Sequence, residues 1–359
     1  MKINRQIFQD ILDKAILCVA KEGLFSNAFL FENETINAYN VETAIKISLP
    51  FSFYKEKFAV KAIDLYKLIK KIPDEEVDII LEENELVIKT NNIEASLQLL
   101  EDDFSEEMKE LNIEEWVDLP ENFLPGLELS IMPKNIHFYS GICGENGKLY
   151  SVDGQKCSIY NTGKDIGYFW ISVEDVKKIL KIFSGSIQCH NGKAWITFRQ
   201  NNITFSCKKK IGIEHEFKTK PCENIFKKYG QWDSDIYGSF PDDFQKIIER
   251  ASLFVKRKEA LFLKFNNDSI ECKTENQIGN YNEKIEWKHE IKKEFDPFEC
   301  IIKVDHILYA LKRTNQFYLK YPEDINEIKD YKDQKSTTGK RIIFVSDNYK
   351  LIIACYEEI

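Results

Sequence analysis

Residues 58–100 read FAVKAIDLYKLIKKIPDEEVDIILEENELVIKTNNIEASLQLL, and they predict one amphipathic helix followed by short strands. The helix, from Ile63 to Ile72, has leucines and isoleucines at the spacing i, i+3, i+4, i+7, which is one face of an α-helix. Lysines occupy the opposite face. Strands are predicted at 78–82, 86–89 and 93–99, because apolar and polar residues alternate there between Asn-containing turns. Such a unit covers a sheet with its helix and leaves lysines on the outside.

The same unit returns later in the chain. Val176, Ile179, Leu180 and Phe183 repeat the apolar face at one constant shift, and Lys178 and Lys181 repeat the lysines. Strands are again predicted, at 187–190, 194–199 and 203–208. A third copy begins at Val304 and has a less basic polar face. The chain is therefore built from repeats of one helix-and-strand unit.

A related unit precedes two of these copies. Apolar residues of 8–19 match those of 244–255 at one constant offset, and Lys14 and Lys21 match Arg250 and Arg257. The corresponding unit of the middle copy, 123–132, contains Pro125 and Gly126, which limit any helix there to a short piece. The repeats predict an α+β protein of three tandem domains of two units each, at 1–115, 116–232 and 233–359. The acidic run 101–115 is predicted to be the first linker.

Composition limits the class of protein. No apolar run follows Met1 and no segment is apolar enough to span a membrane, so we expect a cytoplasmic protein without a membrane partner. Nine cysteines without a C-x-x-C pair are typical of buried thiols in a reducing compartment rather than of disulfides or zinc sites.

The charge pattern allows two interpretations. A net charge of −9 argues against nucleic acid binding, yet the cations gather on repeated helix faces while Asp and Glu concentrate in linkers and turns. One lysine face alone is more simply explained as solvated surface. Recurrence of the cations at equivalent positions favours a shared ligand, because solvation does not require the same positions to stay basic.

Motifs for catalysis are absent from the sequence. It contains no phosphate-binding G-x-x-x-x-G-K-[ST] loop, no G-x-S-x-G, no H-E-x-x-H and no G-x-G-x-x-G. The five histidines are far apart in sequence. We therefore expect neither an enzyme nor a metal or other cofactor.

Three local segments, in order, resemble the bacterial-type β sliding clamp, the DNA polymerase III beta subunit that serves as processivity factor. Residues 150–156, YSVDGQK, resemble the second-domain A-T-D-G-H-R segment of that family, and residues 249–253, ERASL, resemble the R-A that opens its third domain. Residues 280–287 resemble the strand after that domain's first hairpin. The resemblance covers the whole chain and implies the DNA clamp fold, with helices lining a ring and sheets outside.

The resemblance implies a homodimeric ring that encircles double-stranded DNA, is loaded by an ATP-dependent clamp loader and tethers a DNA polymerase and other replication or repair proteins. Contact with phosphates alone would be independent of base sequence and would allow sliding. The cations expected to face DNA are Lys14, Lys21, Lys67, Lys70, Lys71, Lys177, Lys178, Lys181, Arg250 and Arg257.

Ring closure in the family pairs an edge strand of domain 1 with one of domain 3 of the partner. The matching positions are Ala95 and Leu97 against Leu253 and Phe254. Leu253 and Phe254 fit an interface and an ordinary core equally well. Three segments favour a dimer over the trimers formed by two-domain clamps of other lineages.

A second family site is a groove between domains 2 and 3 that takes a hydrophobic peptide from polymerases, loaders and repair proteins. Here the sequence departs from the family, since the histidine and arginine after D-G are Gln155 and Lys156, and the C-terminal M-P-M-R is replaced by residues 354–357, ACYE. A divergent phage or mobile-element clamp with its own polymerase fits these differences. The implied groove residues are Tyr139, Gly154, Gln155, Lys156, Cys157, Pro221, Phe226, Ile352, Ala354 and Tyr356.

Two other classes of function compete with the clamp. A clamp-like decoy or regulatory protein would sequester clamp partners without encircling DNA, and neutralising its helix lysines would change nothing. An enzyme acting on DNA would require a metal or nucleophile constellation that the sequence lacks.

Overall fold

The computed structural model describes the chain except residues 21–26, 33, 54–56, 102, 110–112, 114, 133–140, 154–155, 211–235, 256–259, 277–278, 292–294, 322–336 and 357–359. The chain folds into two compact units. Unit 1 comprises residues 1–128 and 164–212, and unit 2 comprises residues 129–163 and 213–359.

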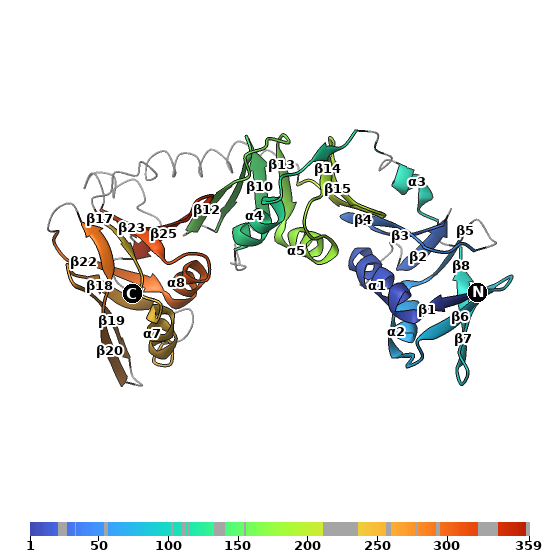
Figure 1. Cartoon of the computed structure of the whole chain (residues 1–359), viewed down its shortest axis with the longest axis horizontal. Coiled ribbons are helices and arrows are strands. Elements are labelled where there is room, and N and C mark those ends of the chain that lie inside the picture. The colour runs from blue at the N-terminus through green and yellow to red at the C-terminus, as the bar shows by residue number, and fades with distance from the viewer. Residues whose placement is uncertain are drawn as a thin grey trace. The chain divides into compact units, whose positions relative to one another are not determined.

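Unit 1 is built on one long antiparallel sheet whose strands lie in the order β1-β6-β7-β8-β5-β2-β3-β4-β16-β15-β14-β9 (Figure 1). Consecutive hairpins supply most neighbours. The strands of the unit are β1 Lys2–Asn4, β2 Ala28–Glu32, β3 Thr35–Asn40, β4 Thr43–Ser48, β5 Lys57–Lys61, β6 Glu76–Leu81, β7 Glu85–Lys89, β8 Glu94–Leu100, β9 Val117–Asp118, β13 Phe169–Ser172, β14 Gln188–Asn191, β15 Trp195–Gln200 and β16 Ile203–Lys208.

Helices cover unit 1 on both faces of its sheet. α1 (Arg5–Ala15) and α2 (Ala62–Lys71) lie on one face, while α3 (Ser105–Lys109) lies on the other (Figure 1). α1 begins at Asn4, whose side chain accepts a hydrogen bond of 3.1 Å from the Ile7 amide and so satisfies one open helix donor. α5 (Val173–Ile182) begins in the same way, at Ser172.

The sheet of unit 2 runs β10-β11-β12-β25-β22-β18-β19-β20, with β24, β23, β17 and β21 paired in turn beyond β25. α7 (Phe244–Ala251) and α8 (Val304–Leu311) belong to this unit, and α4 (Phe123–Ser130) crosses from unit 1 into it. The strands are β10 Gly141–Glu145, β11 Lys148–Val152, β12 Lys156–Asn161, β17 Ile236–Ser239, β18 Ala260–Phe265, β19 Ser269–Asn276, β20 Gly279–Glu286, β21 Lys288–Ile291, β22 Phe298–Lys303, β23 Gln316–Lys320, β24 Thr337–Val345 and β25 Tyr349–Tyr356.

The repeats predicted from the sequence are present as elements. α2 and α5 each precede three antiparallel strands, β6 to β8 and β14 to β16, within a residue or two of the predicted bounds. Leu65 and Val176, which correspond in the two copies, are both fully buried. The apolar spacing predicts the buried face because a helix on a sheet buries one stripe only.

Two strand pairs join the repeats into the long sheets. β4 pairs with β16, Ile47 opposite Ile203, and β12 pairs with β25, Cys157 opposite Ile352. Each pair joins strands from two of the three predicted segments. The middle segment, 116–232, contributes its α5 half to unit 1 and its β10 to β12 half to unit 2. The division at 115 and 232 stays a prediction.

Two sequence expectations have clear outcomes among the described residues. The eight cysteines there are all buried and unbridged, as predicted. The acidic run 101–115, predicted as the first linker, contains the short helix α3, which follows Phe104. Phe104 packs with Ala28, Leu30 and Ala59 on the sheet face opposite α1. One buried aromatic residue in a charged run gave too weak a periodic signal to predict this helix.

Candidate nucleic-acid and partner interfaces

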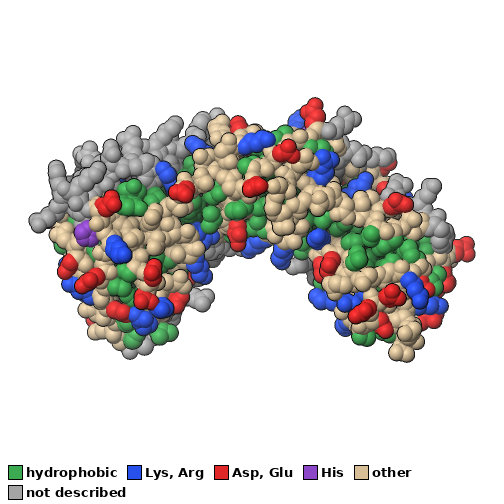
Figure 2. All heavy atoms as spheres, in the orientation of Figure 1, with side chains coloured by type: hydrophobic (Ala, Val, Ile, Leu, Met, Phe, Trp, Pro, Cys, Tyr) green, Lys and Arg blue, Asp and Glu red, His purple; other side chains and the backbone are tan. Residues whose placement is uncertain are grey.

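The helices α2 and α5 carry the predicted lysines on their exposed sides. Lys67, Lys71, Lys177 and Lys181 are exposed, whereas Ile69 and Ile179 of the same helices are buried. The last turns of both helices are basic, which is favourable because the carbonyl ends of helices attract positive charge. Lys and Arg side chains are visible in Figure 2 along the side of unit 1 where α2 and α5 lie.

Lys70 takes part in a small network between α2 and α1. Its ammonium group donates a hydrogen bond of 3.1 Å to the Tyr66 hydroxyl, which in turn donates to Asp13 at 2.9 Å. The bond to Tyr66 raises the pKa of Lys70, so its charge is retained at neutral pH. Lys14, beside Asp13 in the chain, is half-exposed.

Lys178 differs from its neighbours because it is turned inward. Its Nζ donates a hydrogen bond of 3.0 Å to Thr43 Oγ1 on β4 and lies 3.7 Å from Asp175 Oδ1. Only 22% of its side chain is exposed. Burial raises the pKa of Asp175, and the hydroxyl of Ser172, which lies 2.6 Å away, offsets this effect. Lys178 therefore ties α5 to β4 and is poorly placed to contact phosphate.

Arg250 on α7 is also engaged within the chain. It forms a two-pronged contact with Glu283 on β20, with Nη2–Oε1 at 2.6 Å and Nε–Oε2 at 3.1 Å. Arg250 lowers the pKa of Glu283 and keeps it ionised. The Tyr281 hydroxyl also donates to Glu283. The sequence missed this pair because its members lie on different elements.

The predicted interface residues of unit 2, Leu253 and Phe254, lie near β20, the strand that carries Glu283. Leu253 is 76% exposed, the largest exposed fraction among the large apolar residues that the structure describes. Phe254 is partly buried and lies against Tyr281, with ring centroids 5.6 Å apart. β20 pairs with β19 along one side only within the described chain. The sequence did not distinguish the roles of these two residues. In the structure Leu253 lies on the surface, whereas Phe254 packs against Tyr281.

Ala95 and Leu97 lie on β8. This strand pairs with β7 along Glu94–Gln98, and with β5 only at its end, where Leu99 and Leu100 are paired. Both predicted residues are half-buried. In the described chain, one side of residues 94–98 therefore offers backbone groups for pairing.

The described residues of the predicted peptide groove lie together in unit 2. Cys157 and Ile352 are direct cross-strand partners, both are buried, and Ala354 follows on β25, half-buried. Lys156 forms an ion pair with Asp153 at 2.6 Å, with only 2% of its side chain exposed. Its Nζ also lies 5.5 Å from the centre of the Tyr309 ring, a cation–π distance.

Polar residues on α8 and just after it form a cluster next to these groove residues. The Tyr309 hydroxyl and the Arg313 guanidinium both donate to the Leu129 carbonyl, each at 3.1 Å, and the Arg313 side chain stacks on the Tyr309 ring. His306 is buried nearby. Burial, with the charges of Lys156 and Lys303, lowers the pKa of His306 to about 3, so the ring is neutral. Neither Tyr309 nor Arg313 was predicted from the sequence to be a site residue.

Several predicted positions lie outside the described residues. These are Lys21 and Arg257 of the DNA set and Tyr139, Gly154, Gln155, Pro221 and Phe226 of the groove. Tyr356 ends β25.

The described part of the chain holds no group of three or more His, Cys, Asp or Glu residues that could bind a metal ion. Among the same residues, no helix has the length and apolar character that crossing a membrane requires.

Sheets built from repeated helix-and-strand units, in this order of elements, are the fold of the DNA sliding clamps. Comparison with solved structures shows this fold over 99% of the chain. A putative DNA polymerase III beta subunit from Eubacterium rectale is similar with a TM-score of 0.75 and 14% identity, covering 99% of this chain and 98% of that one. The DNA polymerase III beta chain of Streptococcus pneumoniae is similar with a TM-score of 0.79 and 12% identity, covering 99% of each chain.

The Helicobacter pylori beta clamp, solved bound to a DNA ligase peptide, gives a TM-score of 0.77 at 12% identity and covers 99% of both chains. No protein-family model and no curated protein matches the sequence. The likeness is thus one of fold, retained at low sequence identity.

Proposed function

We propose that this protein is a DNA sliding clamp, a ring of two copies that encircles duplex DNA and tethers a DNA polymerase. The observation that carries the proposal is the recurrence of exposed lysines on equivalent helices of a clamp fold, on α2 and again on α5. The ring is made of three tandem segments per copy, and the protein acts in the cytoplasm without catalysis of its own.

Exposed helix cations suit a sliding contact. Phosphates are identical at every step of the duplex, so Lys67, Lys71, Lys177 and Lys181 bind them without fixing a register. The net charge of −9 repels DNA from the rest of the surface. Lys178 and Arg250 instead form contacts within the chain, with Thr43 and Glu283.

Ring closure uses the two exposed sheet edges. β8 of one copy pairs with β20 of the other, which satisfies the backbone groups that both strands otherwise leave to solvent. Leu253 is covered in that interface, since an apolar side chain that is 76% exposed in one copy gains from burial against another.

Partner recognition takes place at the groove around Cys157, Ile352 and Ala354. The ligase peptide in the H. pylori clamp is an example of a partner peptide on this fold. In this chain the groove binds a peptide of its cognate polymerase and of an ATP-dependent clamp loader. Because the residues after Asp153 and at the C-terminal end differ from the family pattern, its preferred peptide differs too.

The decisive experiment measures retention on DNA. The protein is loaded by its cognate loader onto nicked circular duplex and passed over a sizing column, before and after the circle is linearised. Retention that is lost on linearisation, together with a dimer mass, supports the clamp. A monomer that is never trapped but still binds the polymerase peptide supports the decoy instead.

A further inference from the structure

We infer that unit 1 carries a second docking site, a trough on the sheet face opposite α1 that binds an extended peptide with an acidic and a basic residue three or four positions apart. We call this site the linker trough. Its floor is the row Asn37, Lys46, Thr204 and Arg199, and the residues that form its walls are Asp103, Ser105, Glu106, Met108, Ile113 and Trp116. It shares no residue with the predicted peptide groove or with the helix faces.

Strand register builds the floor. Asn37 is opposite Lys46, Lys46 is opposite Thr204, and Thr204 is opposite Arg199. Directly opposite residues point to the same face of a sheet, so these four side chains form one polar row across β3, β4, β16 and β15. The Leu30 that continues the row belongs to the apolar cluster under Phe104. The row therefore lies on the face that α3 covers.

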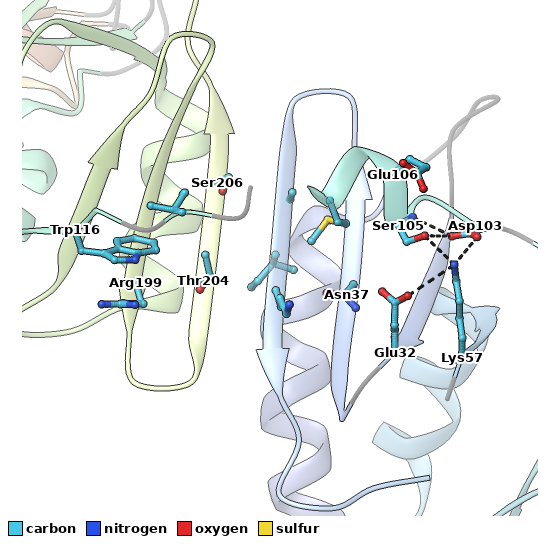
Figure 3. Close-up of a pocket in the computed structure, with 15 residues that line it drawn as sticks. Glu32, Asn37, Lys57, Asp103, Ser105, Glu106, Trp116, Arg199, Thr204 and Ser206 are labelled. Carbon is cyan, nitrogen blue, oxygen red and sulfur yellow. Dashed lines mark hydrogen bonds and ion pairs between the residues drawn. The ribbon is translucent and has the colours of Figure 1, made fainter. Parts of the chain in front are cut away.

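The linker supplies walls to the trough. Met108 of α3 and Trp116 line it. Figure 3 shows two groups of side chains, with Trp116, Arg199, Thr204 and Ser206 on one side and Asn37, Glu32, Lys57, Asp103, Ser105 and Glu106 on the other. The Arg199 guanidinium lies over the Trp116 ring, with Cζ 4.2 Å from the ring centre. Gln188 accepts from the same guanidinium at 2.6 and 3.1 Å. Arg199 is thus held in place against Trp116.

The two ends of the trough carry opposite net charge. The end at β15 and β4 has Arg199 and Lys46, and no hydrogen bond or ion pair joins Lys46 Nζ to any residue in the part of the chain that the structure describes. The other end has Glu32, Asp103, Glu106 and Lys57, and Lys57 contacts Asp103 and lies 3.8 Å from Glu32 Oε1 and 2.8 Å from Ser105 Oγ. Lys57 lowers the pKa of Asp103 to about 2, and the three carboxylates outnumber the one ammonium group at this end.

The distance between the two charged ends determines the spacing of charged residues in the peptide that would bind. Lys46 and Glu32 are two strands apart and offset by two residues along the strands. At about 4.8 Å per strand and about 3.4 Å per residue, they lie roughly 12 Å from each other, the span of three to four extended residues. An acidic side chain of the occupant meets Lys46, a basic one meets the Glu32 and Glu106 end, and apolar residues between them meet Met108. A nucleic acid is disfavoured because its phosphates at that end would meet three carboxylates against the single ammonium group of Lys57.

The test uses fluorescence anisotropy of labelled peptides on the full chain. The peptide GDLLSKG is expected to bind saturably and at least tenfold more tightly than its neutral counterpart GNLLSQG. Lys46→Glu is expected to weaken the charged peptide about tenfold and to restore binding to GKLLSKG. The matched control is Lys193→Glu, which reverses an exposed lysine in the β14–β15 turn of the same sheet and should leave binding unchanged.

Equal binding of the charged and neutral peptides overturns the inference, as does an equal effect of Lys46→Glu and Lys193→Glu. Binding of a labelled oligothymidylate in preference to GDLLSKG also overturns it. A thermal melt confirms that each variant is folded. Because Lys46→Glu leaves the helix faces and groove intact, its retention on circular DNA should match the wild type, so this inference and the clamp proposal fail independently.

Discussion

Arg250 on α7 and Glu283 on β20 form a two-pronged ion pair, with contacts of 2.6 and 3.1 Å. The sequence placed Arg250 among the DNA-facing cations because it matches Lys14 in the repeat. In the folded chain its charge is paired with the carboxylate of Glu283 on β20, the strand at the end of the unit 2 sheet order. The cation thus fixes α7, and with it the exposed Leu253, against the edge proposed to close the ring.

Neutralising the outward lysines should weaken DNA contact in a salt-dependent way. Each phosphate contact contributes about 0.9 to the slope of log K against log salt concentration. The quadruple variant Lys67→Ala, Lys71→Ala, Lys177→Ala and Lys181→Ala should therefore lower that slope by about 3 to 4, measured on a short duplex. Lys178→Ala should leave the slope unchanged, since that ammonium group is bonded to Thr43. An unaltered slope in the quadruple variant would favour the decoy.

Leu253→Asp should dissociate the proposed dimer. Burying a large apolar side chain contributes about 1.5 to 3 kcal/mol, and an aspartate in its place would be desolvated without a partner. We expect the dimer dissociation constant to rise at least tenfold in sedimentation velocity runs. Ile7→Asp, at a 52% exposed position of α1, is the control and should keep the wild-type mass. Identical behaviour of the two variants would refute the interface.

Ala354→Asp should abolish binding of the cognate polymerase peptide. Ala354 is half-buried on β25, next to the Ile352 and Cys157 pair, so a carboxylate there meets an apolar peptide side chain. A loss of at least tenfold in affinity by calorimetry is expected. Asn348→Asp adds a charge at an exposed turn beside the same strand and should bind normally. Normal binding by Ala354→Asp would move the peptide site elsewhere.

His306 should make the protein less stable in acid. Its pKa falls from 6.5 to about 3 on folding, mainly through burial, so below pH 6.5 the unfolded chain binds a proton that the folded chain does not. Stability present above pH 6.5 is lost as the pH falls toward 3, by up to about 1.4 kcal/mol per pH unit. Urea titrations of wild type and His306→Gln between pH 7 and 4.5 should show a steeper loss in the wild type. Parallel curves would show that the ring titrates normally.

The repeats were readable from sequence because each is a local pattern. The apolar stripe of Leu65, Ile69 and Ile72 gave α2 within a residue, and the same spacing from Val176 gave α5. Apolar positions on a helix or strand report which side faces the core, wherever the core lies. The eight described cysteines were likewise predicted as buried from their number and spacing alone.

The candidate sites were only partly predictable. Exposure of Lys67, Lys71, Lys177 and Lys181 follows from helix periodicity. The inward turn of Lys178 does not, because Thr43 is distant in sequence and becomes its neighbour only when β4 pairs with β16. The row from Asn37 to Arg199 is invisible in the sequence for the same reason, since strand register decides which residues are opposite.

The sequence by itself determined the helix-and-strand unit, its repetition, the apolar faces and the lysines that recur opposite them. Tertiary structure alone decided which cations remain available. It paired Arg250 with Glu283, enclosed Lys156 with Asp153, and left Lys67 exposed. The physical reason is that side-chain periodicity is set within a few residues, whereas a charge is neutralised by whichever element the fold places beside it.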